Sequence, residues 1–106
     1  MTNNYFKNLK QKGIPFMEGR EKGDIRDLLD KEIHIADFGF IRGDNGDYSV
    51  FITKEDDKNF YCAGMAVTET LRIIKDDGKR HELPDQPCKL VEVTSKSKRK
   101  YITIEF

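Results

Sequence analysis

The chain contains no tryptophan and, in 106 residues, only three prolines, two cysteines and two histidines. The two cysteines, Cys62 and Cys88, are too few for a disulfide-linked scaffold, which predicts a domain held together by an apolar core in a reducing compartment. No apolar run approaches the roughly 20 residues that cross a bilayer. The first residues also lack the apolar centre of a signal peptide. We therefore expect a cytoplasmic protein that does not associate with membranes.

Patterns of catalytic and metal-binding residues are also scarce. His34 and His81 stand apart from each other and from both cysteines, without the short spacings of a zinc site. No serine lies in a glycine-flanked nucleophile elbow, and no glycine-rich phosphate loop occurs. Cys62 alternates with apolar Phe60, which is typical of a small core residue rather than of a nucleophile. We expect a protein without catalytic activity, cofactor or metal ion.

Charged residues are abundant but balanced. They make up 36% of the chain, with 19 basic and 19 acidic residues and a formal net charge of zero. The length predicts one small domain with a modest core. Because the net charge is zero, attraction to a charged partner has to come from a local patch.

The first part of the chain, residues 1–23, is expected to be an arm that precedes the domain at 24–106. Its residues 5–9 could form an apolar helix face, and 14–17 are expected to be extended because Pro15 restricts the residue before it. The polar, glycine-rich segment 18–23 is expected to be mobile. Two interpretations stay open: a flexible arm, or an arm that docks its aromatic residues on the domain or on a partner.

The rest of the chain alternates in the patterns of a β-rich domain. Asp24 and the apolar spacing after it predict one capped helical turn. Period-2 alternation predicts strands at 32–41, 48–54, 59–63, 88–94 and 101–106. Apolar residues at i, i+3, i+4 and i+7 predict a helix at 67–74. Asn45-Gly46 is a strong hairpin signal, and Gly39 within the first strand predicts a bulge or bend.

This β-β-β-α-β-β order is that of the five-stranded Greek-key barrel known as the OB-fold, which binds oligonucleotides and oligosaccharides. We therefore expect a mainly β protein with this barrel. The order indicates where a ligand would lie, but a fold alone does not determine the ligand.

A basic cluster occupies the loop between the last two expected strands. Lys96, Lys98, Arg99 and Lys100 are four cations in five positions, in one of the two loops that contact oligonucleotides in this barrel. Cations there would contact phosphates and release counterions. The alternative is a solvated, positively charged turn.

Aromatic residues are the second candidate for ligand contact, since bases stack on exposed rings. Alternation places Phe40, Phe51 and Tyr61 on the face opposite the isoleucines, and Tyr101 borders the basic loop. The alternative is that some of these rings pack beneath the arm or the helix. Together with the cations, the expected nucleic-acid-binding residues are Phe40, Arg42, Phe51, Lys54, Tyr61, Lys96, Lys98, Arg99, Lys100 and Tyr101.

Several segments resemble a known family. They are 15–24 (PFMEGREKGD), 31–41 (KEIHIADFGFI), 48–51 (YSVF), 60–64 (FYCAG) and 99–104 (RKYITI). In these segments the chain resembles small single-stranded-DNA-binding-type proteins of tailed phages and prophages of Gram-positive bacteria. The resemblance implies an OB barrel in the cytoplasm of the bacterial host cell, acting in phage DNA replication or recombination. Because the last expected strand ends at Phe106, an acidic-tipped recruiting tail is not expected.

A second function class stays open. The barrel face or the N-terminal arm could bind a host or phage protein, such as a replication protein. The zero net charge and the acidic first hairpin, with Asp44 and Asp47, favour this protein-interaction module. The basic loop and the surplus of aromatic residues favour single-stranded DNA. Oligosaccharide binding is a third, weaker interpretation, and the sequence is compatible with a homo-oligomer.

Overall fold

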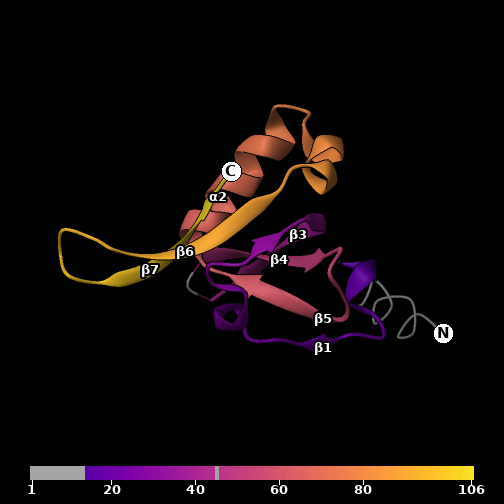
Figure 1. Ribbon diagram of the computed structural model, residues 1–106, viewed down its shortest axis with the longest axis horizontal. Coiled ribbons are helices and arrows are strands. Elements are labelled where there is room, and N and C mark those ends of the chain that lie inside the picture. Colours follow the sequence, from indigo (N-terminus) through magenta and orange to yellow (C-terminus); the bar gives the residue numbers. More distant parts are fainter. Residues whose placement is uncertain (1–13, 45) are drawn as a thin grey trace.

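The computed structural model describes residues 14–44 and 46–106, which form a mainly β protein with two sheets and one α-helix (Figure 1). The larger sheet contains, in spatial order, β1 (Glu21–Lys22), β5 (Asp56–Ala63), β4 (Gly46–Thr53) and β3 (Ile35–Gly43). The smaller sheet contains β2 (Glu32–Ile33), β6 (Cys88–Thr94) and β7 (Lys100–Glu105). The helices are α2 (Met65–Asp76) and the 3-10 turns η1 (Pro15–Met17), η2 (Ile25–Leu28) and η3 (Arg80–Asp85).

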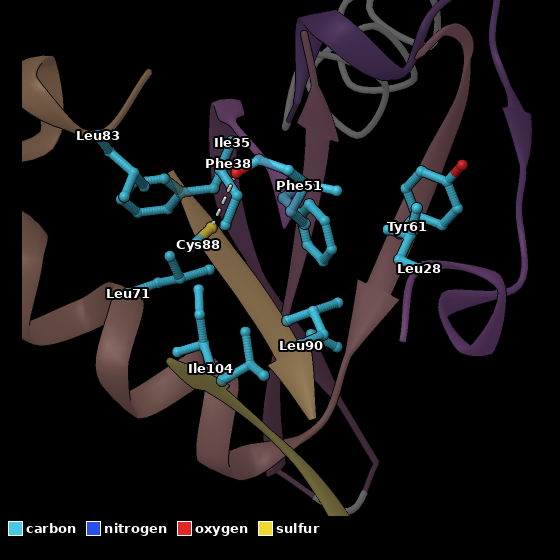
Figure 2. Close-up of a cluster of buried hydrophobic side chains, with 13 residues drawn as sticks. Leu28, Ile35, Phe38, Phe51, Tyr61, Leu71, Leu83, Cys88, Leu90 and Ile104 are labelled. Atoms are coloured by element: carbon cyan, nitrogen blue, oxygen red, sulfur yellow. Dashed lines mark hydrogen bonds between the residues drawn. The ribbon is translucent and has the colours of Figure 1, made fainter. Parts of the chain in front are cut away.

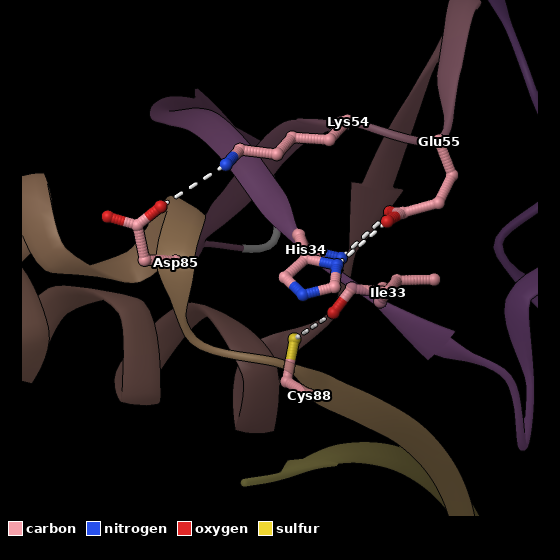
Figure 3. A network of polar contacts seen from close by, with 6 residues as sticks. All are labelled: Ile33, His34, Lys54, Glu55, Asp85 and Cys88. Atoms are coloured by element: carbon pink, nitrogen blue, oxygen red, sulfur yellow. Dashed lines mark hydrogen bonds and ion pairs between the residues drawn. The ribbon is translucent and has the colours of Figure 1, made fainter.

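The expected first strand bends at His34 and serves both sheets. Before the bend β2 pairs with β6, and after it β3 pairs with β4. Glu55 binds the bend, accepting the His34 backbone N–H at 2.8 Å and contacting the ring Nδ1 at 2.7 Å (Figure 3). A second irregularity lies between Ile35 and Asp37, whereas Gly39 pairs regularly with Val50. The predicted bend exists, but its predicted position at Gly39 is wrong.

This irregularity decides which aromatic rings enter the core. An extra residue in a strand reverses the side to which later side chains point, so Phe38 follows Ile35 into the interior. Phe38 pairs with Phe51, and Phe51 pairs with Tyr61 across the sheet. These three side chains are 1%, 0% and 6% exposed (Figure 2). The prediction that Phe51 and Tyr61 point outward is therefore wrong.

The opposite face of β4 is buried as well. Val50 and Ile52, expected to point into the main core, lie on this reverse side at 0% and 8% exposure. Gly39, the partner of Val50, lies against Ile14, since an added Cβ would stand 3.1 Å from the Ile14 Cδ1. Ile14, which precedes β1, thus contacts this reverse face of the larger sheet.

Residues 14–23 are docked, which contradicts the expectation that 18–23 are mobile. The Arg20 guanidinium donates to the carbonyls of Asp56 and Asn59 at 3.0 and 3.1 Å. β1 then pairs in parallel with β5, and the Gly23 N–H donates to Phe60 O. Ile14 is extended, as expected of the residue before Pro15, whereas Pro15–Met17 form η1 rather than an extended segment. The helix expected around residues 5–9 lies outside the described residues.

The helix predicted at 67–74 is confirmed and is longer, spanning the whole of α2. It buries Val67, Thr68 and Leu71, and the Thr68 hydroxyl donates to Ser49 Oγ at 2.8 Å. The chain leaves the helix at Gly78 with φ of +71°, a conformation that glycine adopts without strain. The helix packs on β4 and β7, so the core lies between α2 and the two sheets (Figures 1 and 2).

The two sheets stay open on one side: within residues 14–44 and 46–106, β5 does not pair with β7. Mainly β architecture is therefore confirmed, without a closed barrel in this part of the chain. The helices of the same residues are too short or too polar to span a membrane.

Candidate nucleic-acid interface

The basic loop lies at the tip of the β6–β7 hairpin, which projects beyond the sheets (Figure 1). Ser95 organises the turn: its N–H donates to Arg99 O at 2.8 Å, and its carbonyl accepts from Lys98 N. Its hydroxyl accepts from the Arg99 N–H at 3.3 Å and contacts Ser97 Oγ at 2.9 Å. Lys98 adopts a φ of +64°. These bonds hold a short loop whose side chains point to solvent.

The structure brings five of the predicted residues together on this hairpin. All four cations of the loop are exposed, and Tyr101 is 45% exposed. None of the four cations forms an ion pair with another described residue. This group, called the hairpin patch below, consists of Lys96, Lys98, Arg99, Lys100 and Tyr101.

A hollow of about 560 Å³ adjoins the hairpin patch. Lys100 and Tyr101 line it together with Met65 at the start of α2 and the ion pair of Arg26 with Glu92, whose charged atoms are 2.8 Å apart. The hydrogen bond from Arg26 lowers the pKa of Glu92 below its usual value. Sequence patterns do not reveal Arg26 and Met65 as neighbours of the hairpin patch, because only folding brings η2 and α2 beside the hairpin.

Phe40 and Arg42 lie on β3 rather than on the hairpin patch. The Phe40 ring is half-buried, and two cations of α2 lie over it, Arg72 at 5.0 Å and Lys75 at 5.5 Å from the ring centroid. Its ring is therefore already occupied by cation–π contacts. Arg42 is exposed near the end of the strand. These helix cations were also missed, because they come from a distant segment of the chain.

Lys54 lies in the turn between β4 and β5, away from the hairpin patch. Its ammonium is 3.3 Å from the carboxylate of Asp85 in η3 (Figure 3). Both side chains are well exposed, so this pair contributes little to stability. Lys54 is thus accessible but already partnered.

Phe51 and Tyr61, the two residues expected to stack on bases, are enclosed instead. The Tyr61 hydroxyl donates to Asp56 Oδ2 at 2.7 Å. Burial and this carboxylate raise the pKa of Tyr61 to about 12. The same hydrogen bond, with one from the Lys58 N–H, lowers the pKa of Asp56. Both rings therefore act in the core and not at a surface.

The remaining ionisable groups near the bend serve the fold. Burial opposes the ionisation of Glu55, but its hydrogen bonds from His34 outweigh this and lower its pKa. Burial raises the pKa of the Cys88 thiol to about 11, and its Sγ donates to Ile33 O at 3.5 Å (Figure 3). A thiol with so high a pKa is a poor nucleophile. No three His, Cys, Asp or Glu side chains in the described ranges are grouped as metal ligands.

Comparisons with protein-family models, with curated proteins and with solved structures find no match to this chain. The hairpin patch is therefore a candidate binding surface on the basis of its exposure and its charge alone.

Proposed function

We propose that the protein binds single-stranded DNA without catalysis, and that the hairpin patch is its main contact surface. The observation that carries this proposal is four solvent-exposed cations and one half-exposed tyrosine on a projecting hairpin. Cations at this density favour a polyphosphate backbone over an isolated carboxylate. The resemblance noted in the sequence suggests phage DNA replication or recombination as the setting.

Phosphate contacts and one stacked base would supply the affinity. Each cation that meets a phosphate releases a bound counterion, which makes the affinity dependent on salt. In this proposal the exposed Tyr101 ring stacks with a base, and Lys100, the preceding residue of β7, contacts a phosphate of the same strand of DNA. The adjacent hollow, with Met65 and Ile102 among its lining residues, offers an apolar wall beside that base.

The strand order supports the proposal. The bent segment β2–β3 pairs with both β4 and β6, and β6 pairs with β7. These pairings support the proposal of an OB-type barrel left open between β5 and β7, a fold in which the loop between the last two strands is a common nucleic-acid contact. The face of β4 usually used by such barrels is buried at Val50 and Ile52. We therefore propose that the ligand binds the hairpin rather than the sheet face.

Titrations of labelled oligo-dT and of a matched duplex at two salt concentrations test this function. We expect oligo-dT to bind more tightly, with log affinity falling at a slope of about −0.7 per phosphate contact. Replacing Lys96, Lys98, Arg99 and Lys100 by alanine should flatten the slope. Replacing exposed Lys31 and Lys58 is the control and should leave it nearly unchanged. An equal slope in both variants contradicts the proposal.

A protein partner is the second candidate. Two large apolar side chains on α2 are exposed, Met65 at 69% and Ile73 at 60%, and exposed apolar residues that gather on one helix can mark an interaction site. If oligo-dT does not bind while the fold is intact, this interpretation takes precedence over the first.

A further inference from the structure

Among residues 14–44 and 46–106, no strand pairs with the outer edge of β7. In the part of the chain that the structure describes, β7 pairs with β6 alone, over six consecutive residue pairs without a bulge. Its sequence, Lys100-Tyr-Ile-Thr-Ile-Glu105, contains no proline and is rich in strand-forming residues. Proteins normally block such edges with proline, bulges, charged side chains or a covering segment, because free edges pair with other chains. β7 has charged side chains only at its two ends, Lys100 and Glu105.

The hairpin geometry defines which groups of β7 point to this edge. The hydrogen bond from Ser95 N to Arg99 O makes these two residues a hydrogen-bonded pair of the β6–β7 ladder. Hydrogen-bonded and non-hydrogen-bonded pairs alternate along an antiparallel ladder. Lys100, Ile102 and Ile104 consequently belong to non-hydrogen-bonded pairs with β6. The backbone N–H and C=O groups of these three residues point away from β6, towards the free edge of β7, and form no hydrogen bond with β6.

We propose that a second copy of this chain pairs along that edge, β7 against β7 in antiparallel orientation, about a two-fold axis at Ile102. In this register Lys100 faces the partner's Ile104, so the outward groups of both strands exchange hydrogen bonds. The product is a continuous four-stranded sheet made of β6 and β7 from both copies. A two-fold contact of this kind closes on itself and gives a dimer.

Charge complementarity selects this register. It places Arg99 directly opposite the partner's Glu105, twice by symmetry, and Tyr101 opposite the partner's Thr103. A shift of two residues in either direction removes the Arg99 contact with Glu105. Neither side chain is in an ion pair within the described chain, and both are exposed. Opposite charges facing each other across strands stabilise a sheet.

Exposed apolar surface lies on the same side of the molecule. Tyr101 on β7 and Met65 at the start of α2 line the hollow beside this edge, at 45% and 69% exposure. The dimer would carry one basic loop at each end of its sheet. The dimer would engage Arg99 and Tyr101, and it would leave Lys96, Lys98 and Lys100 for phosphates. The proposal does not depend on the nucleic-acid function, because it rests on the edge of β7 and on the charges of Arg99 and Glu105.

Sedimentation equilibrium of the full chain without nucleic acid tests the dimer. We expect a mass of twice 12.3 kDa at high micromolar concentration. Arg99→Glu and Glu105→Arg should each raise the dimer dissociation constant about tenfold, because each change places like charges opposite one another twice. The double variant should restore dimerisation. Lys96→Glu, in the same loop but without an opposing residue, is the control and should not weaken the dimer.

Two results overturn the proposal. A monomeric mass at every concentration excludes the dimer. A dimer that neither single variant weakens, or that the double variant fails to restore, excludes pairing along β7 in this register. Circular dichroism of each variant confirms that the fold is intact before the masses are compared.

Discussion

The rings of Phe51 and Tyr61 lie stacked inside the protein, with centroids 5.7 Å apart and ring planes at 29°. They are directly opposite each other on β4 and β5. Stacked aromatic pairs contribute beyond the area that they bury. This pair therefore belongs to the centre of the core, and the surface available for a ligand has to be sought elsewhere.

The first prediction follows from this stack. Phe51→Ala should lower the free energy of unfolding by about 3–5 kcal/mol, because a fully buried ring leaves a cavity. Phe60→Ala, on the half-buried reverse face of β5, should cost clearly less. Urea denaturation of both variants measures the difference. A larger loss for Phe60→Ala would mean that the faces of β5 are reversed.

The second prediction concerns alkaline pH. The pKa of the Tyr61 hydroxyl is near 10 in the unfolded chain and is raised to about 12 in the folded protein. Deprotonation therefore favours unfolding, so this stability contribution is complete below pH 10 and is lost as pH rises towards 12. Tyr61→Phe has no ionisable ring and should lose less stability over this range. Urea midpoints between pH 9 and 12 test this, and parallel curves for both proteins would contradict it.

The third prediction concerns the bend at His34. Glu55→Ala removes the carboxylate that accepts the His34 backbone N–H. At neutral pH it should lower the free energy of unfolding by about 1 kcal/mol, because the site is partly exposed and water can replace the carboxylate. The lowered pKa of Glu55 makes this contribution present above its usual pKa of 4.5 and lost as pH falls through the folded value. The stabilities of wild type and variant should therefore converge in acid. A constant difference down to low pH would contradict the prediction.

The fourth prediction uses two glycines. A Cβ at Gly23 would stand 2.5 Å from the Tyr61 ring, whereas one at Gly64 would meet nothing within 4 Å. Gly23→Ala should lower the free energy of unfolding by about 1–3 kcal/mol, because the docked segment has to move away from the ring. Gly64→Ala is the control: it introduces no close contact, and because alanine is a poorer N-cap of α2 than glycine it should cost no more than about 1 kcal/mol. Thermal denaturation compares the two, and equal losses would show that β1 is not tightly docked.

The fifth prediction tests stacking on the hairpin patch. Tyr101→Ala should weaken oligo-dT binding by about 1–3 kcal/mol and leave the urea midpoint nearly unchanged, since the ring is 45% exposed. Tyr101→Phe keeps the ring and should retain most of the affinity. Fluorescence anisotropy measures both. If Tyr101→Phe loses as much affinity as Tyr101→Ala, the hydroxyl and not the ring makes the contact.

Local patterns sufficed for the helix α2 and for the capped turn at Asp24, but not for β1 or η1. The apolar spacing from Val67 to Ile74 predicted the helix, Asp24 predicted the capped turn, and its carboxylate does accept the Arg26 N–H at 2.9 Å. The basic loop could also be predicted from the sequence, because its four cations fall within five consecutive residues and a hairpin turn exposes its side chains to solvent. The helix, the capped turn and the charge of the loop depend mainly on neighbouring residues, whereas β1 exists only because it pairs with distant β5.

Tertiary structure decided which face of each strand is inside. Alternation placed Phe51 and Val50 on opposite faces, but it carries no information on which face meets the core. That choice depends on the irregularity between Ile35 and Asp37, on α2 covering one side, and on Ile14 covering the other. The cation–π contacts of Phe40 and the hollow beside Tyr101 arise in the same way. They join residues far apart in the sequence, and the packing of whole elements brings such residues together.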